Sequence, residues 1–213
     1  MTPGHAVPDP WHVQPAPHDQ PQRRRILLWG TYDLGKPRTR VLRDGLKAIG
    51  HEVIEVHTEV WAGIEDKSQL SGRSKARAVL RLLAAYPGLL WRYLRAPDHD
   101  VVLVPYPGQF DLLLLWPLAR LRRKPVIWDM FLSLYDTVVN DRRMAGPRSV
   151  TAWGLKLVER IGTRAADLVL LDTPAHARHI ARLFNVPPAR VASVPVGVEP
   201  AAFPRLAAPS PGD

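Results

Sequence analysis

The sequence predicts an α/β fold built on a doubly wound parallel sheet, and three observations support this prediction. Six short apolar segments recur along the chain, separated by segments with helical spacing. The apolar segments carry few polar residues on either face, as strands do when helices cover both sides of a sheet. A chain of 213 residues, 46% of them hydrophobic, is long enough to bury such a core in one domain.

The first strand-loop-helix unit organises the rest. Residues 26–29 predict a strand that ends at Gly30, and a loop follows. Helical spacing then begins near Thr39, which we expect to be the N-cap, and it ends at Gly50. Residues 52–56 form the next predicted strand. Open parallel sheets bind ligands where strands end, so the loop after Gly30 should border the site.

The later elements alternate in the same way. We expect strands at residues 101–104, 125–128, 168–171 and 191–194, and helices at residues 74–94, 110–122, 150–166 and 174–184. Outside this pattern, residues 1–23 are rich in proline and predict a disordered leader, whereas residues 204–213 predict a tail or interdomain linker. Residues 24–203 are the predicted domain.

Composition narrows the possible functions. The chain has no cysteine, which excludes disulfides, thiolate catalysis and Cys-ligated zinc. Lys and Arg number 29 against 20 acidic residues, and the net charge of +9 favours anionic partners: nucleic acid, acidic lipid or phosphorylated substrates. The polar first 25 residues show no signal-peptide pattern. The longest apolar run, residues 112–119, contains a proline and is far shorter than the ~20 residues of a membrane span.

The loop after the first strand is the first candidate site. It opens with Gly30, Thr31 and Tyr32, and Arg38 and Arg40 follow near the start of the helix. Arginine at a helix N-terminus suits a phosphate group. The alternative is an ordinary turn with solvated basic residues, and the absence of a G-x-G-x-x-G pattern leaves both interpretations open.

Polar residues also crowd after the fourth predicted strand, where Asp129, Ser133, Tyr135, Asp136 and Asp141 lie within thirteen residues. Carboxylates at this edge of a sheet can bind sugar hydroxyls or serve as a general base. Asp129, at the predicted strand end, is the best base candidate, and Asp136 is the second catalytic candidate. The alternative is that about half of these side chains only cap helices and turns.

Asp172 and Thr173 follow the fifth strand and precede a helix that opens with a proline. We expect an N-cap role first and a substrate contact as the alternative. His176 and His179 lie three residues apart, a spacing that can bind metal, but no third ligand accompanies them, so we expect no metal site.

Residues 73–95 contain six basic residues and no acid, with Trp91 and Tyr93 among the apolar positions. A basic amphipathic helix with aromatic residues suits an anionic membrane surface, with both aromatics at headgroup depth. Pro87 should kink this helix. The alternative is an ordinary core helix with one solvated face.

The end of the chain carries a more specific pattern. A strand, a turn and an acid followed by phenylalanine match P-x-G-V-(D/E)-x-x-x-F at Pro195, Gly197, Val198, Glu199 and Phe203. This resembles the interdomain hinge of the GT-B glycosyltransferases of the family-4 type. Residues 166–173 resemble a second frequent feature of that family, AD-x-V-x-x-DT. The resemblance covers about residues 24–203.

The resemblance implies a Rossmann-like domain that binds the acceptor, a glycan or a lipid-linked sugar. In that family a second domain binds the nucleotide-sugar donor through a glutamate pair spaced E-x7-E. No such pair occurs here, so we expect the acceptor half alone, as a truncated chain, a fragment or a split-enzyme subunit, with the donor bound by a missing C-terminal domain or a partner chain. The resemblance implies no cofactor, a cytoplasmic location and an anionic membrane surface as a possible partner. We expect no nucleic-acid partner, because the sequence contains no recognisable motif for one.

Three rival functions differ in how well the sequence supports them. A nicotinamide-binding module lacks the required glycine fingerprint. A nucleic-acid-binding protein lacks any recognisable motif, since the basic residues are scattered over helices. A non-catalytic scaffold or binding subunit that keeps the acceptor domain stays open.

Overall fold

The computed structural model describes residues 22–60 and 72–197, with only the backbone for residues 72–76 and 78. The strands are β1 (Arg25–Gly30), β2 (Glu52–His57), β3 (Val101–Val104), β4 (Val126–Phe131), β5 (Leu168–Leu171) and β6 (Val191–Ser193). The helices are α1 (Pro37–Ala48), α2 (Gly72–Leu94), α3 (Gln109–Leu121), α4 (Val150–Ala165) and α5 (Pro174–Phe184), with a π-helical turn η1 (Asp136–Asp141) and a 3-10 turn η2 (Pro188–Arg190). The predicted leader and tail lie outside the described residues, except for Gln22 and Arg23.

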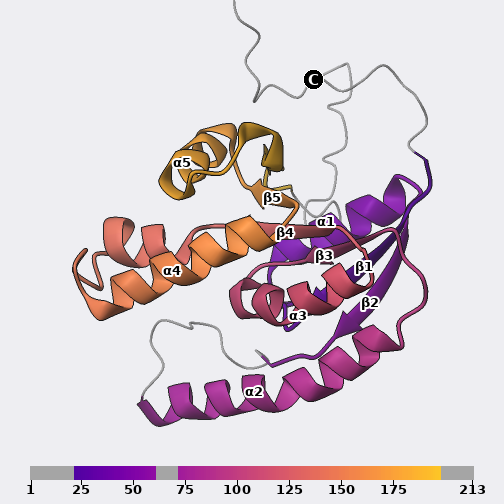
Figure 1. Ribbon diagram of the computed structural model, residues 1–213, viewed down its shortest axis with the longest axis horizontal. Helices are drawn as coiled ribbons and strands as arrows, with labels where there is room; N and C mark the ends of the chain where they lie inside the picture. Colours follow the sequence, from indigo (N-terminus) through magenta and orange to yellow (C-terminus); the bar gives the residue numbers. More distant parts are fainter. Residues whose placement is uncertain (1–21, 61–71, 198–213) are drawn as a thin grey trace, which may run out of the picture.

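The strands form one six-stranded parallel sheet in the order β2-β1-β3-β4-β5-β6, which confirms the predicted fold class (Figure 1). β1 is an inner strand, although it stands second from the edge rather than in the middle. Leu27, Leu28 and Trp29 are fully buried, as expected for a strand covered on both faces. The chain reverses direction across the sheet between β1 and β3, which is where ligands bind in folds of this kind.

Because parallel crossovers are right-handed, α1 lies on one face of the sheet and α2 to α5 lie on the other. Alternating side chains of each strand serve the two faces. Trp29 and Trp128 join the larger apolar cluster under α2, α3 and α5, while Leu28 and Leu103 join the smaller cluster beneath α1. The larger cluster therefore holds most of the core.

Two predicted N-caps have different outcomes. Thr173 is the N-cap of α5, and its hydroxyl accepts a hydrogen bond from the N–H of His176 at 3.2 Å, as predicted. Thr39 is not the N-cap of α1. That helix begins at Pro37 with Lys36 as its N-cap, because proline favours the first helical position. Thr39 lies instead in the first turn, buried.

β4 is longer than predicted, and this changes the setting of Asp129. Pairing with β5 continues through Asp129 to Phe131, with a register irregularity between them. Phe131 adopts a left-handed φ of 57°, so the strand ends two residues beyond Asp129. Asp129 is therefore an interior residue of a buried strand instead of a strand-end residue.

α2 runs as one helix through Pro87. Its two aromatic residues near the C-terminal end separate: Trp91 is 55% exposed, whereas Tyr93 is fully buried. The prediction that both lie at headgroup depth is therefore wrong for Tyr93, because its position faces the core under the sheet. Among the described residues, no helix has the length and hydropathy that crossing a bilayer requires.

Candidate functional site

Three buried carboxylates lie beneath the carboxyl edge of the sheet. Asp111 comes from the first turn of α3, Asp129 from β4 and Glu159 from α4, and none is more than 1% exposed. Ionised side chains are rarely buried without partners. Each of the three is hydrogen-bonded to a different segment of the edge, and these contacts shape the candidate site.

Asp129 forms a buried ion pair with Arg38 at the start of α1. The Nη2 of Arg38 lies 2.7 Å from Oδ1 of Asp129, and its Nε lies 3.1 Å from Oδ2. The Nη1 of the same guanidinium donates to the carbonyl oxygen of Val194, and the guanidinium carbon stands 5.1 Å from the centre of the Phe131 ring. One arginine thus joins α1, β4 and the segment that leaves β6.

This geometry bears on the predicted role of Asp129 as a base. Burial raises the pKa of Asp129, and the hydrogen bonds and charge of Arg38 oppose that rise. Both carboxylate oxygens are directed at the guanidinium, and the residue has no exposed surface. The arrangement favours a positioning role for the pair, in which Arg38 is an anchor rather than a phosphate ligand.

Asp111 holds the loop after β1. Its Oδ2 accepts from the backbone N–H of Thr31 at 2.6 Å, and the Thr31 hydroxyl lies 3.0 Å from Oδ1. The hydroxyl of Tyr86, on α2, donates to the same Oδ1 at 2.8 Å. A Cβ on Gly30 would meet Oδ2 at 2.3 Å, and Gly30 has a φ of +136°, so only glycine fits at this turn.

The partners of Asp111 are neutral, in contrast to the guanidinium beside Asp129. Burial raises the pKa of Asp111 to about 6, although the hydrogen bonds from Thr31 and Tyr86 work against the rise. Burial and the neighbouring Asp111 carboxylate also raise the pKa of the Tyr86 hydroxyl, which therefore remains a donor at neutral pH.

Glu159 holds the loop after β4. Its Oε2 accepts from the Ser133 hydroxyl at 2.6 Å, and its Oε1 accepts from the backbone N–H of Leu134 at 2.5 Å. Burial raises the pKa of Glu159, and these bonds oppose the rise. The Ser133 hydroxyl also accepts from the N–H of Asp136 at 3.0 Å. Ser133, a predicted substrate contact, is thus engaged in loop anchoring.

The other predicted residues of this loop face outward. Asp136 is half-buried, and its Oδ1 accepts from Asn140 at 2.6 Å and lies 3.5 Å from Nε2 of His179. The amine of Lys156 stands 5.4 Å from the centre of the Tyr135 ring. Asp141 is exposed at the end of η1. Asp136, Tyr135 and Asp141 therefore have the access to solvent that Asp129 lacks.

The start of α5 contributes the next group. The Oδ1 of Asp172 lies 2.9 Å from Nδ1 of His176, and the hydroxyl of Thr173 donates to the same oxygen at 3.3 Å. The contact between His179 and Asp136 connects this turn to η1. Asp172 and Asp136, predicted from separate segments, are thus joined through two histidines of one helix.

Two predicted residues of the first loop point elsewhere. Tyr32 is fully buried toward α1, where its ring stacks on His57 at 4.2 Å and its hydroxyl donates to Glu55 at 3.3 Å. Arg40 lies in the first turn of α1 and donates to the carbonyl oxygen of Leu34 in the preceding loop. The geometry favours structural roles for both.

The sequence prediction did not include Asp111 or Glu159. A signal for both was present, because each is the single acid of an otherwise apolar or basic helix. In α4, Glu159 also falls on the buried side with Ala152 and Thr163. A lone acid in phase with the core positions indicates a buried carboxylate that needs donors.

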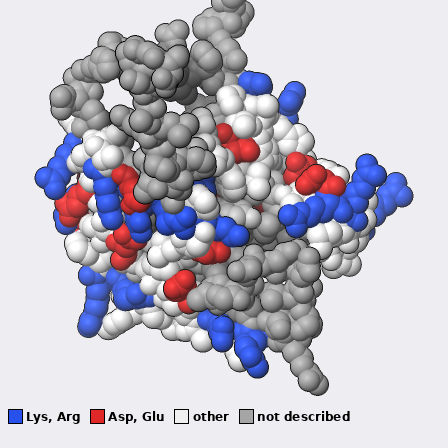
Figure 2. All heavy atoms as spheres, turned by 180° about the vertical axis from the view of Figure 1, so that it is seen from behind, with Lys and Arg blue, Asp and Glu red and all other residues white. Residues whose placement is uncertain are grey.

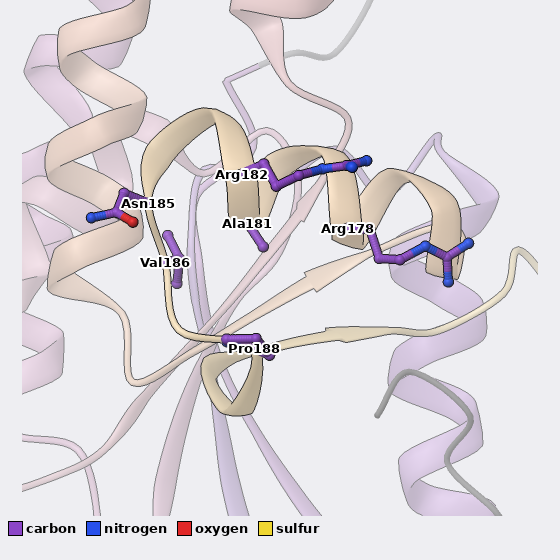
Figure 3. Close-up of a pocket in the computed structure, with 6 residues that line it drawn as sticks. All are labelled: Arg178, Ala181, Arg182, Asn185, Val186 and Pro188. Carbon is purple, nitrogen blue, oxygen red and sulfur yellow. The ribbon is translucent and has the colours of Figure 1, made fainter. Parts of the chain in front are cut away.

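A cavity of about 400 Å³ lies away from this edge, between the last turns of α5 and η2 (Figure 3). In the figure, Ala181 and Val186 point toward Pro188. Its lining residues are Arg178, Ala181, Arg182, Asn185, Val186 and Pro188. Within residues 22–60 and 72–197, no cluster of three or more His, Asp or Glu side chains is suited to a metal ion.

Comparison with protein families decides the identity of the domain. The family model described as glycosyl transferase 4-like domain matches residues 35–197. The chain belongs to this family. The matched region runs from the loop after β1 to the segment after β6, so it contains Asp111, Asp129 and Glu159. No curated protein matches the chain significantly.

Family membership confirms the resemblance seen in the sequence and agrees with half of a GT-B fold. Of the hinge pattern, Pro195 and Gly197 lie in the described structure, whereas Val198, Glu199 and Phe203 lie outside the described residues. In this glycosyltransferase 4-like domain, Arg38 ties Val194 to the sheet directly before that pattern begins.

Proposed function

We propose that this domain is the acceptor-binding half of a glycosyltransferase that moves a sugar from a nucleotide-sugar donor to a hydroxyl group of a glycan or lipid-linked sugar. The observation that carries the proposal is the family match over residues 35–197. The carboxyl edge of the sheet supports it, because buried carboxylates hold two loops there in fixed positions and leave polar side chains facing outward.

Within this proposal, Asp136 is the stronger of the two catalytic candidates. It is partly exposed, and His179 and Asn140 orient its carboxylate. Asp141, Tyr135 and Asp172 would contribute hydrogen bonds to acceptor hydroxyls. Asp129 acts with Arg38 to position the edge.

We propose that the donor binds to a second domain or a partner chain, because the sequence contains no glutamate pair with E-x7-E spacing. In that case these 213 residues alone do not transfer sugar. The test is an assay with radiolabelled UDP-, GDP- and ADP-sugars, with and without a donor-binding partner. Robust turnover by the isolated chain would contradict this part of the proposal.

In the assembled enzyme, Asp136→Asn should lower turnover by about 100-fold, the scale typical of a lost acid–base group, while the melting temperature stays unchanged. Asp44→Asn is the matched control, since Asp44 is an exposed acid of α1 on the other face of the sheet. Equal activity of the two variants would remove Asp136 from the catalytic group.

A non-catalytic scaffold is the second candidate, and one observation favours it. Asp111, Asp129 and Glu159 are all engaged in internal contacts, which leaves the edge more anchored than open. Two measurements separate the candidates. A scaffold would bind no acceptor glycan, and it would show no sugar transfer when the donor-binding partner is added.

We further propose that the domain binds its acceptor at an anionic membrane surface, on the cytoplasmic side. Helix α2 has no acid, and Arg77 and Arg81 are exposed beside exposed Leu80 and Leu83. This combination favours reversible peripheral binding.

A further inference from the structure

The outward sides of α2, α3 and α4 hold most of the exposed apolar side chains of the domain. These helices cover the same face of the sheet (Figure 1). Within the described residues, all but three of the exposed large hydrophobic side chains lie on them, the exceptions being Ile49, Met144 and Val196. Single exposed hydrophobic residues are ordinary, but a contiguous set indicates an interaction surface.

Helix α4 shows the pattern most clearly. Val150, Trp153, Leu157 and Ile161 recur at intervals of three or four residues, so they form one stripe along the helix. All four are exposed, and Trp153 is 67% exposed. The buried stripe of the same helix contains Ala152, Glu159 and Thr163. The apolar side of α4 therefore faces solvent, which reverses the usual orientation of an amphipathic helix on a sheet.

The charges on these three helices all have one sign at the surface. Their only acids are Asp111 and Glu159, both buried. Exposed cations lie beside the apolar stripes, namely Arg77 and Arg81 on α2, and Lys156, Arg160 and Arg164 on α4. The surface is thus apolar and cationic, with no exposed acid on the helices themselves.

Within residues 22–60 and 72–197, the other elements lack this combination. Helix α5 buries its apolar residues, including Ile180 and Phe184, and no large hydrophobic side chain on it is exposed. In the view from behind that of Figure 1, Lys and Arg are interspersed with Asp and Glu (Figure 2). Among the elements that the structure describes, the combination is therefore confined to three neighbouring helices.

We infer that the outward faces of α2, α3 and α4 together form the surface that docks on an anionic lipid bilayer, with α4 as a second docking element beside α2. This inference rests on the membrane part of the proposed function. Tryptophan and arginine are residues that settle at the headgroup level, and here the guanidinium of Arg95 lies 4.1 Å from the centre of the Trp91 ring.

Charge decides between a bilayer and a second copy of the chain. A symmetric dimer through this face would place the cationic surfaces of two copies against each other, and like charges repel. An anionic bilayer attracts every exposed charge of the face at once. The three helices lie in one layer, so their apolar stripes can contact the flat surface of a bilayer together.

The test is co-sedimentation of the full chain with phosphatidylglycerol–phosphatidylcholine vesicles and with phosphatidylcholine vesicles. We expect binding to the anionic vesicles that weakens at high salt. Each basic residue near an anionic surface contributes about 1 kcal/mol, which corresponds to about fivefold in binding. Arg160→Gln with Arg164→Gln should therefore lower the partition coefficient by about 25-fold, whereas Arg182→Gln on α5 should leave it unchanged.

A second pair of variants tests the apolar stripe. Ile161→Gln on α4 should weaken vesicle binding, whereas Ile49→Gln, at an exposed isoleucine on the other face of the sheet, should not. Circular dichroism melts of each variant check that the fold is kept. Sedimentation measures binding without sugar transfer, so a failed transfer assay leaves this result intact.

Two outcomes overturn the inference. If Arg77→Gln with Arg81→Gln abolishes binding and the α4 variants bind like the wild type, α4 is not a docking element. If the chain stays in the supernatant with both vesicle types, the face fits an acidic protein partner and not a membrane.

Discussion

Asp111 and Asp129 lie at the same edge of the sheet and are equally buried, but their partners differ. Asp129 faces the guanidinium of Arg38, which is 4% exposed, whereas Asp111 faces a backbone N–H and the hydroxyls of Thr31 and Tyr86. A cation compensates the charge of Asp129, whereas only neutral donors surround Asp111. Two aspartates that look alike in the sequence therefore differ in their response to mutation and to pH.

The difference teaches that burial alone does not define the role of a carboxylate. Removing Asp129 leaves a buried guanidinium without its counterion, which is among the most destabilising changes in a core. Removing Asp111 leaves neutral donors, each with a smaller desolvation penalty. Asp129 stabilises the junction of α1, β4 and the segment that leaves β6, and Asp111 sets the shape of the loop after β1.

The largest expected effect is that of Asp129→Ala. It should lower the free energy of unfolding by about 3–5 kcal/mol, because Arg38 then stays buried and unpaired. Denaturant unfolding monitored by circular dichroism measures it. The double variant Arg38→Met with Asp129→Leu should lose less than the single one, since it removes both charges. A single-variant loss below about 1 kcal/mol would show that the pair is not buried as described.

The next effect is the pH dependence that Asp111 contributes. Its folded pKa of about 6 lies above the ordinary value of 3.8, so the folded state holds the proton more tightly than the unfolded chain. The stabilisation is complete below about pH 4 and is lost as the pH rises through 6, by a total on the order of 3 kcal/mol. Between pH 4 and 8, the free energy of unfolding of the wild type should fall by about this amount relative to that of Asp111→Asn. Parallel curves would contradict the assignment.

The smallest effect separates the donors of Asp111. Tyr86→Phe removes one hydroxyl donor and should cost about 1 kcal/mol at pH 8, where the carboxylate is charged, and less at pH 4. Thr31→Val should act similarly but less strongly, because its backbone N–H remains. Thr151→Val, at an exposed threonine of α4, is the control for the second variant. An equal loss at both pH values would show that these donors do not respond to the charge of Asp111.

The sequence by itself determined the order and type of the elements. The apolar runs at residues 101–104 and 168–171 are strands with the predicted bounds, and the helix over residues 174–184 begins at its predicted cap. These features depend on neighbours in the chain: a buried strand needs consecutive apolar residues, and a helix start needs Thr173 followed by proline. The family resemblance also followed from local patterns, and the match over residues 35–197 confirms it.

Only the tertiary structure decided what the polar residues do. Arg38 and Asp129 are 91 residues apart, and Thr31 and Asp111 are 80 apart, so no local pattern could pair them. The orientation of α4 depends on tertiary contacts for the same reason: an apolar stripe usually marks the buried side of a helix, but in α4 Glu159 occupies the core side. The loop after β4 supplies the donors that this buried carboxylate requires. Local periodicity reports that a helix has two sides, and only the packed neighbours decide which side is buried.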